Sequence, residues 1–508
     1  MRRKIALFLS SAMLACTLGA GPGATTVMAD DAGSASSGDA ELTVGLPQDL
    51  DNSLDPYQIT AAGTREVLFN VFEGLVKPDT EGNFVDAVAS GHSISEDGLT
   101  YTFTLRDGVV FHNGEVVTVD DVLYSVETCA ATTTSTAVAG ALSDVQDITA
   151  DGNEITITLP SANSSFLSTV SSVSIVPASY TDQATAPVGT GPFRFDSYSP
   201  QDKAVFVRND DYYGEKPALA KVTCKIYDDA NALFTALSSG ALDMAFHLTV
   251  NQVNSLSNGY NVLEGEMNLV QALYLNNARE VFADERVRQA LCYAIDVDTL
   301  LELTEDGHGA KLGSSVYPSF GKYFDESLVD AYPYDPDKAA ELLKEAGAEG
   351  LSFTIKVPSN YEPHVETANV IVDMLSMVGV NASIQKVEWN TWLTDVYQGR
   401  DFDATVIGFD AAYLSPDALL QRWVSTDGSN MISYSNPDYD AAIEKAQSTT
   451  DDAGQVEAYK EAQKILSDTA ANVYLQDLAD FVALNPAFEG YEFYPLYAVD
   501  FSKIRPAA

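Results

Sequence analysis

The chain has 508 residues, too many for one hydrophobic core, so two or three domains are expected. Lys and Arg total 28 against 73 Asp and Glu, and the net charge of −45 argues against a surface that binds nucleic acid or anionic lipid. Hydrophobic residues make up 46% of the chain, which excludes disorder for most of its length.

The N-terminus has the pattern of an export signal. A basic start, Met1–Lys4, precedes an apolar run over Ile5–Ala15 that is too short for a membrane span. No later stretch approaches eighteen continuous apolar residues. We therefore expect an exported chain that is soluble or tethered to the membrane.

Two ends are possible for this signal. Residues 13–16 resemble the bacterial lipobox, which predicts a signal peptide over 1–15 and lipid attachment at Cys16. The alternative is a small-residue cleavage site that ends a signal peptide over 1–29 and releases a free protein. In both cases residues 30–39, rich in Ser, Gly, Ala and Asp, form a flexible tether.

Strand and helix patterns interleave in the first half of the chain. Apolar residues alternate with threonines over 99–106, which predicts a half-buried strand. Thr118 and Asp121 have the spacing of a capping box and predict the start of a helix. Further on, the sequence predicts a hairpin over 148–159 and a helix over 229–240.

The second half alternates between helices and strands, as in an α/β lobe. The predicted helices cover 284–301, 335–347, 365–378, 439–447 and 455–468, and the predicted strands cover 353–357 and 404–407. An aromatic tail over 481–501 follows and has no independent core, so it is expected to return to the first part of the chain.

The residues that usually carry chemistry are scattered. Cys129, Cys224 and Cys292 lack the spacing of zinc ligands, and we expect them to be small buried side chains, with a Cys129–Cys224 disulfide as the alternative. The five histidines are dispersed, and the sequence contains no GxSxG, HExxH, Walker A or GxGxxG motif. We expect no catalytic residue, no metal site and no cofactor.

A series of short motifs extends over nearly all of the mature chain. The motifs are Asn52–Pro56, Asn70–Leu75, Ser95–Val109, Phe111–Gly114, Val188–Phe193, Val287–Leu291, Ala294–Asp296 and Tyr434–Tyr439. Together, and in this order, they resemble the family-5 extracellular solute-binding proteins of ABC importers. This group comprises dipeptide- and oligopeptide-binding proteins with nickel- and sugar-binding relatives.

The resemblance implies an α/β fold with two lobes, like that of periplasmic binding proteins of the large peptide-binding type. Lobe I is expected over 40–276 and 486–508, with an extra subdomain at about 77–187, and lobe II over 277–485. A ligand in the hinged cleft would contact both lobes only when they close, and the closed form would dock on a membrane permease.

The resemblance also places the ligand near loops of lobe II, but two charged anchors are missing. Peptide-binding relatives hold the α-ammonium group with an aspartate, and Ala412 occupies the matching place. Asp410, two residues earlier, would substitute only if the loop is rebuilt. The arginine that holds the peptide carboxylate lacks a counterpart, since residues 351–385 contain no Arg. Longer peptides and uncharged solutes would not need these two anchors, because their charged termini stay solvated or are absent.

The candidate ligand-binding residues are mostly aromatic. They are Tyr57, Asn360, Tyr361, Trp389, Trp392, Phe409, Asp410, Tyr413 and Trp423. The rings suit stacking against a ligand, with core packing as the alternative for each.

We expect a non-enzymatic solute-binding component of an ABC importer. Peptides are the expected solute, with an oligosaccharide-like solute or a metal complex as alternatives. The protein is expected to be a monomer at the cell surface, held by its lipid, or else a free secreted or periplasmic protein. Two other classes fit the sequence: a secreted hydrolase working through carboxylates, and a receptor that uses the same fold without transport.

Overall fold

A computed structural model describes residues 40–508 apart from 60, 133–137, 140–141, 143–144, 164, 228, 257–258 and 360. The expected signal peptide, the lipid site at Cys16, the tether at 30–39 and the candidate ligand residue Asn360 lie outside the described residues. Within the described part of the chain, no helix is long and apolar enough to cross a membrane.

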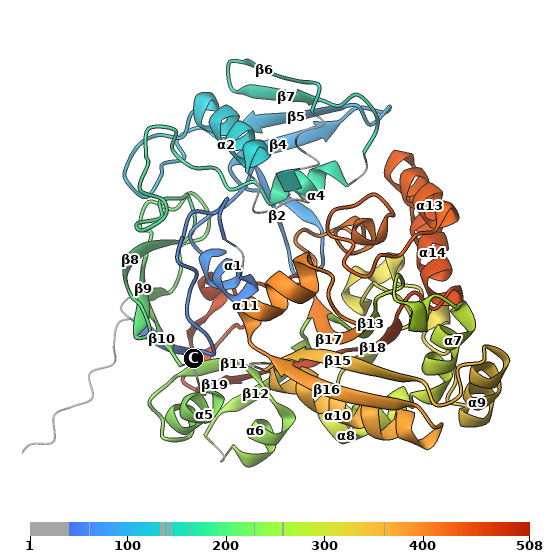
Figure 1. Ribbon diagram of the computed structural model, residues 1–508. Coiled ribbons are helices and arrows are strands. Elements are labelled where there is room, and N and C mark those ends of the chain that lie inside the picture. Colours follow the sequence, from blue (N-terminus) through green and yellow to red (C-terminus); the bar gives the residue numbers. More distant parts are fainter. Residues whose placement is uncertain are drawn as a thin grey trace, which may run out of the picture. The chain divides into compact units, whose positions relative to one another are not determined.

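Seven strands form a mixed sheet, called sheet 1 below (Figure 1). Its order is β12 (Asn261–Glu266), β19 (Ala479–Leu484), β11 (Met244–Leu248), β1 (Ala40–Leu46), β10 (Leu219–Ile226), β9 (Lys203–Arg208) and β8 (Phe193–Ser199). β1 is parallel to β10 and β11, and the other pairs are antiparallel. Helices α5 (Ala230–Ser238) and α6 (Val250–Ser255) connect strands of this sheet.

A four-stranded antiparallel sheet, sheet 2, lies beside helix α2 (Val119–Ala131). Its order is β4 (Ala89–Ile94), β5 (Thr100–Leu105), β7 (Glu154–Thr158) and β6 (Asp147–Asp151). The alternation over 99–106 is confirmed, because the apolar side chains of β5 are buried and its threonines are not. The capping box is confirmed as well: the Thr118 N–H donates to the Asp121 carboxylate at 2.8 Å, and the Asp121 N–H donates to the Thr118 hydroxyl.

Six strands form sheet 3, which is also mixed. Its order is β14 (Ala310–Lys311), β18 (Val473–Asp477), β13 (Val270–Leu275), β17 (Ala404–Phe409), β15 (Ser352–Pro358) and β16 (Asn381–Val387). β15 is parallel to β16 and β17. Helix α10 (Glu362–Met377) packs on these strands with Val365, Ala368 and Ile371 buried.

Several further helices lie around sheet 3 (Figure 1). They are α7 (Glu285–Ala294), α8 (Val297–Glu305), α9 (Pro336–Glu345), α13 (Pro437–Ser448) and α14 (Asp452–Asp468). The single helix predicted over 284–301 is wrong. Ile295 is extended, and the carboxylate of Asp296 accepts the Thr299 N–H at 3.1 Å, so a new helix begins there.

The chain crosses between sheets 1 and 3 twice, at positions that differ from the bounds expected from sequence. β13 pairs in sheet 3 although it precedes residue 277, and β19 pairs in sheet 1 although it precedes residue 486. Both strands are buried throughout, so their sequences carry no sign of which sheet they join. The crossings are side by side, since the Met267 N–H donates to the Leu478 carbonyl at 2.9 Å.

The aromatic tail returns to the first part of the chain, as expected. The Asn70 amide donates to the Val499 carbonyl at 2.7 Å, and the Phe501 N–H donates to the Asn70 side chain at 2.8 Å. A short pair of strands, β20 (Phe488–Glu489) and β21 (Arg505–Pro506), closes the tail on itself. The expectation for the cysteines is also confirmed, because Cys129, Cys224 and Cys292 are buried free thiols.

Candidate functional site

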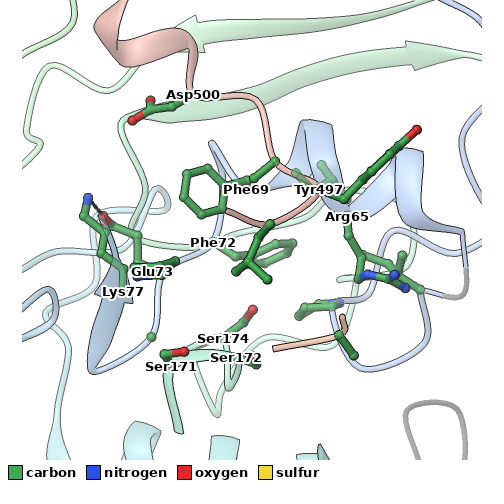
Figure 2. A pocket seen from close by; sticks show the side chains of 18 of the residues that line it. Arg65, Phe69, Phe72, Glu73, Lys77, Ser171, Ser172, Ser174, Tyr497 and Asp500 are labelled. Atoms are coloured by element: carbon green, nitrogen blue, oxygen red, sulfur yellow. Dashed lines mark hydrogen bonds and ion pairs between the residues drawn. The ribbon is translucent and has the colours of Figure 1, made fainter. Parts of the chain in front are cut away.

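A cavity of about 170 Å³ is formed by segments that are far apart in the sequence (Figure 2). Helix α1 (Ala62–Leu68) and the residues after it line one side, and residues 171–174, at the end of α4 (Phe166–Ser171), line another. Residues 410–412, directly after β17, and residues 496–498 and Asp500 of the tail also line it. The cavity therefore joins the end of a sheet 3 strand to segments tied to sheet 1.

The middle of the cavity is apolar. Arg65 and Leu68 of α1 and its C-cap residue Phe69 follow one another at helical spacing and share one face, which explains why all three line the cavity. Figure 2 shows Phe69 and Phe72 between Arg65 on one side and Glu73 and Lys77 on the other. A ligand in this cavity would contact rings along its body and charged groups near its ends.

One charged group is an ion pair between α1 and the loop after β17. The Arg65 guanidinium lies 3.0 Å from the Asp410 carboxylate, and the two side chains are 38% and 24% exposed. Ion pairs as accessible to water as this one contribute at most about 1 kcal/mol to stability. The pair can therefore separate at little cost when a ligand competes for either charge.

A second charged group is buried and more firmly held. The Glu73 carboxylate accepts from the Lys77 ammonium and from the Tyr212 hydroxyl, each at 2.7 Å. Lys77 is also 3.1 Å from the Tyr212 oxygen. Burial disfavours the Lys77 ammonium, but Glu73 beside it outweighs that effect and raises the pKa of Lys77. Lys77 thus stays charged at the cavity.

The tail adds a third acid. Asp500 is buried and accepts from the Tyr494 hydroxyl at 3.0 Å and from the Ser502 N–H at 2.9 Å. Burial and then Asp500 raise the pKa of Tyr494, so this phenol remains a hydrogen-bond donor at neutral pH. The cavity lining therefore contains three carboxylates and two cations.

The fold and motifs agree with known proteins. Bacterial extracellular solute-binding proteins, family 5 Middle, match this chain over residues 83–431. The chain belongs to this family. Members of the family bind solutes for transport, so the chain is a binding protein rather than the secreted hydrolase considered above.

Relatives of the chain carry different ligand names. Heme-binding protein A of Haemophilus influenzae is 28% identical over 448 residues, which are 80% of this chain and 81% of that protein. The dipeptide-binding protein of Escherichia coli K12 is 26% identical over 455 residues, covering 81% and 84%. The structure of DppA from Helicobacter pylori in complex with the peptide STSA has a TM-score of 0.81 and 26% identity, and covers 92% of this chain and 98% of that one.

The two loop positions singled out from the family-5 resemblance both lie at the cavity. Asp410 and Ala412 are lining residues, and Asp410 bonds Arg65. Tyr57 is buried nearby, and its hydroxyl donates to the carbonyl of Ser174, itself a lining residue, at 2.6 Å.

Five of the predicted aromatic residues, in segments that follow strands of sheet 3 or at the end of β17, form a continuous row of rings. Trp389 lies against Tyr361 at 5.3 Å and stacks on Trp392 at 5.2 Å between ring centroids. At the other end, Phe409 contacts Trp423 at 6.1 Å, and Tyr397 bridges the two halves. Among the described residues, those that line the cavity include none of these rings.

Three of the predicted aromatic residues pack in the core. The Trp392 N–H donates to the Thr405 hydroxyl at 3.0 Å, and the Trp423 N–H donates to the Ser315 hydroxyl at 2.9 Å. The Tyr413 hydroxyl donates to Asp417 at 3.1 Å. Burial with internal hydrogen bonds favours a structural role for Trp392, Tyr413 and Trp423, whereas Tyr361, Trp389 and Phe409 keep some exposed surface.

Most of the charged residues that line the cavity were not predicted from the sequence. Arg65, Lys77 and Asp500 come from parts of the chain where no ligand contact was expected. Glu73 lies within the recognised motif Asn70–Leu75, which was the available signal for this wall. The position of Asp500 depends on the return of the tail, which local sequence does not specify.

Proposed function

We propose that this protein captures a solute in the cavity between α1, the tail and the loop after β17, and delivers it to the permease of an ABC importer. The observation that carries this proposal is the Arg65–Asp410 pair, which joins a helix tied to sheet 1 to the end of a strand of sheet 3 across the cavity. A solute at this position would contact both parts of the chain.

Sheets 1 and 3 would be the centres of two lobes, and the neighbouring crossings at 267–269 and 478 would be the hinge. The hydrogen bonds between these crossings support this division. Closure around the solute would follow from its greater affinity for the closed form, since only that form presents both walls of the cavity.

Peptides are the proposed solute class. Short peptides carry charges at their ends and an apolar body, which matches charged groups on either side of Phe69 and Phe72. The cavity volume is close to that of an engineered cavity of about 150 Å³ that accepts benzene, so the enclosed part of the solute is small. The names of two relatives mention peptides, but another mentions heme, and a metal complex or an oligosaccharide-like solute remains the alternative.

The proposed location is the outer face of the cytoplasmic membrane, with the chain held by a lipid on Cys16 as a monomer. Mass determination of the mature protein would show a diacylglyceryl group on Cys16 or a chain that begins at residue 30.

Mass spectrometry of solutes released from gently purified protein tests the function. Short peptides of mixed sequence, present in native spectra and absent after denaturation, are the expected result. A single non-peptide mass would assign the protein to the alternative solute class. Failure of the wild-type protein to retain any compound from its native growth medium would contradict a capture function.

A further inference from the structure

A buried histidine connects three segments next to the cavity. His247 lies in β11, and its Nε2 is 3.0 Å from the Glu66 carboxylate of α1. Its Nδ1 is 3.0 Å from the carboxylate of Asp480, at the start of β19. Ionised carboxylates only accept hydrogen bonds, so a proton on each ring nitrogen satisfies both contacts. The ring is then a buried imidazolium between two acids.

The backbone at His247 is unusual for a strand. Its φ is +56°, in the left-handed region that side chains other than glycine seldom adopt. The pairing of β11 with β19 is irregular between Ala245 and Leu248, and the His247 N–H also donates to Asp480, at 3.1 Å. Such a conformation is strained and persists where surrounding contacts determine it. Strain of this kind is concentrated at functional positions.

The residues that contact the imidazole lie close to the cavity or to the strand crossing. Tyr497 stacks on the ring with 4.7 Å between centroids and itself lines the cavity. Glu66 directly follows Arg65 in α1. Asp480 lies just beyond the crossing, where Asp477 accepts the Leu269 N–H at 2.9 Å.

We propose that His247 is a positioning residue that couples the strand crossing to the cavity, so that movement of β19 at the crossing displaces α1 and Tyr497 together. The proposal rests on the capture function above. The charged imidazole of His247 would transmit movement at the strand crossing to the cavity. This coupling requires the imidazolium, because the neutral ring has one N–H and leaves one carboxylate without its donor.

The groups that face the imidazole make its charge testable. Burial disfavours the imidazolium, but Glu66 and Asp480 outweigh that effect and hold the pKa of His247 well above its usual value. Burial also raises the pKa of Glu66, and the charge and hydrogen bond of His247 oppose that rise. The other titratable groups around these acids are Tyr497 and Tyr491 of the tail, Cys224 of β10 and Asp477 of β18, and burial raises the pKa of each of them. Removing the charge of Asp480 should therefore lower the pKa of His247.

The contacts of His247 should weaken as the pH rises, because they depend on the charged ring. A histidine with a raised pKa keeps its contacts below that pKa and loses them as the pH rises through it. Wild-type protein should hold solute across the neutral range, whereas D480N should lose it on going from about pH 6 to about pH 8.

The test measures capture of an equimolar mixture of unmodified di- and tripeptides by the full mature chain, with bound peptide quantified by mass spectrometry. We expect D480N to capture peptide as the wild type does at low pH and at least about fivefold less at high pH, and H247Q to be reduced at every pH. H308Q is the matched control, because His308 makes an exposed pair with Glu264 at 2.7 Å. Thermal denaturation of each variant checks that it is folded.

Two results would overturn the coupling: a D480N profile parallel to that of the wild type, or a folded H247Q that captures peptide as well as the wild type. Absence of capture by the wild type at every pH would instead contradict peptide capture itself. A parallel D480N profile that lies below the wild type, with the loss equal at low and high pH, would show that Asp480 is merely structural.

Discussion

At the scale of single residues, the cavity contains two ion pairs that differ in how tightly they are held. The pair between Arg65 and Asp410 is partly exposed, whereas Glu73 is buried and bonded by both Lys77 and Tyr212. Exposed pairs exchange partners readily, but a buried carboxylate with two donors does not. We therefore expect the Arg65–Asp410 pair to open for a solute and the Glu73 cluster to form a fixed wall.

The substitution D410N tests this difference. It should change the free energy of unfolding by less than about 1 kcal/mol, because the pair is accessible to water. Peptide capture should nevertheless fall severalfold, since the loop loses the charge that it presents to the cavity. Urea denaturation and quantified capture provide the two measurements. D401N is the control, because Asp401 forms a similar exposed pair with Arg279 at 2.8 Å, away from the cavity lining. Equal capture by D410N and D401N would exclude a role for Asp410 in binding.

At the scale of elements, helix ends show what the sequence could predict. The capping box of α2 was readable because Thr118 and Asp121 act within one turn. The break between α7 and α8 was missed because the apolar stripe continues through Ile295, and only the extended backbone there reveals that Asp296 is a cap. Local chemistry thus predicted the existence of elements better than their ends.

Substitution of Thr118 tests how much the capping box of α2 contributes to the free energy of unfolding. T118A removes the hydroxyl that accepts the Asp121 N–H and should lower the free energy of unfolding by about 1 kcal/mol. T118S keeps the hydroxyl and should remain close to the wild type. A loss in T118S as large as that in T118A would show that the methyl group, rather than the cap, is responsible.

The end of α8 supplies a pH-dependent prediction. Burial, and then Glu366 and Asp306, raise the pKa of Glu305 from 4.5 to about 7. The folded state binds this proton more tightly than the unfolded state, so stability falls as the pH rises from about 4.5 to about 7. E305Q removes the titrating group and should be more stable than the wild type above that window, by up to about 3 kcal/mol. Denaturation midpoints measured from pH 4 to pH 8 test this, with the exposed Glu302 substituted in E302Q as the control. Parallel curves for wild type and E305Q would contradict the prediction.

At the scale of the whole molecule, contacts between distant segments decide the site, and these were the least predictable from sequence. Motif order identified the fold. Asp410 and Ala412, which the resemblance placed near the ligand, line the cavity. The partner of Asp410 was not predicted, because Arg65 lies far away in sequence and reaches it only through the arrangement of sheets 1 and 3. The crossings at 267–269 and 478 were misplaced for the same reason, since uniformly buried strands do not indicate their partners.

The return of the tail supplies the last prediction. Residues 496–498 and Asp500 line the cavity, and Asn70 holds this segment by donating to the Val499 carbonyl and accepting the Phe501 N–H. N70A leaves both buried backbone groups without these partners, and a buried group that loses its hydrogen bond costs about 1–3 kcal/mol. We expect N70A to be destabilised by that order and, while still folded, to exchange the amide protons of 496–501 faster and to capture less peptide. N83A is the control, because Asn83 is exposed and bonds Asp79 locally at 3.3 Å. If exchange in the tail stayed at the wild-type rate while stability fell, Asn70 would stabilise the fold without holding the tail at the cavity.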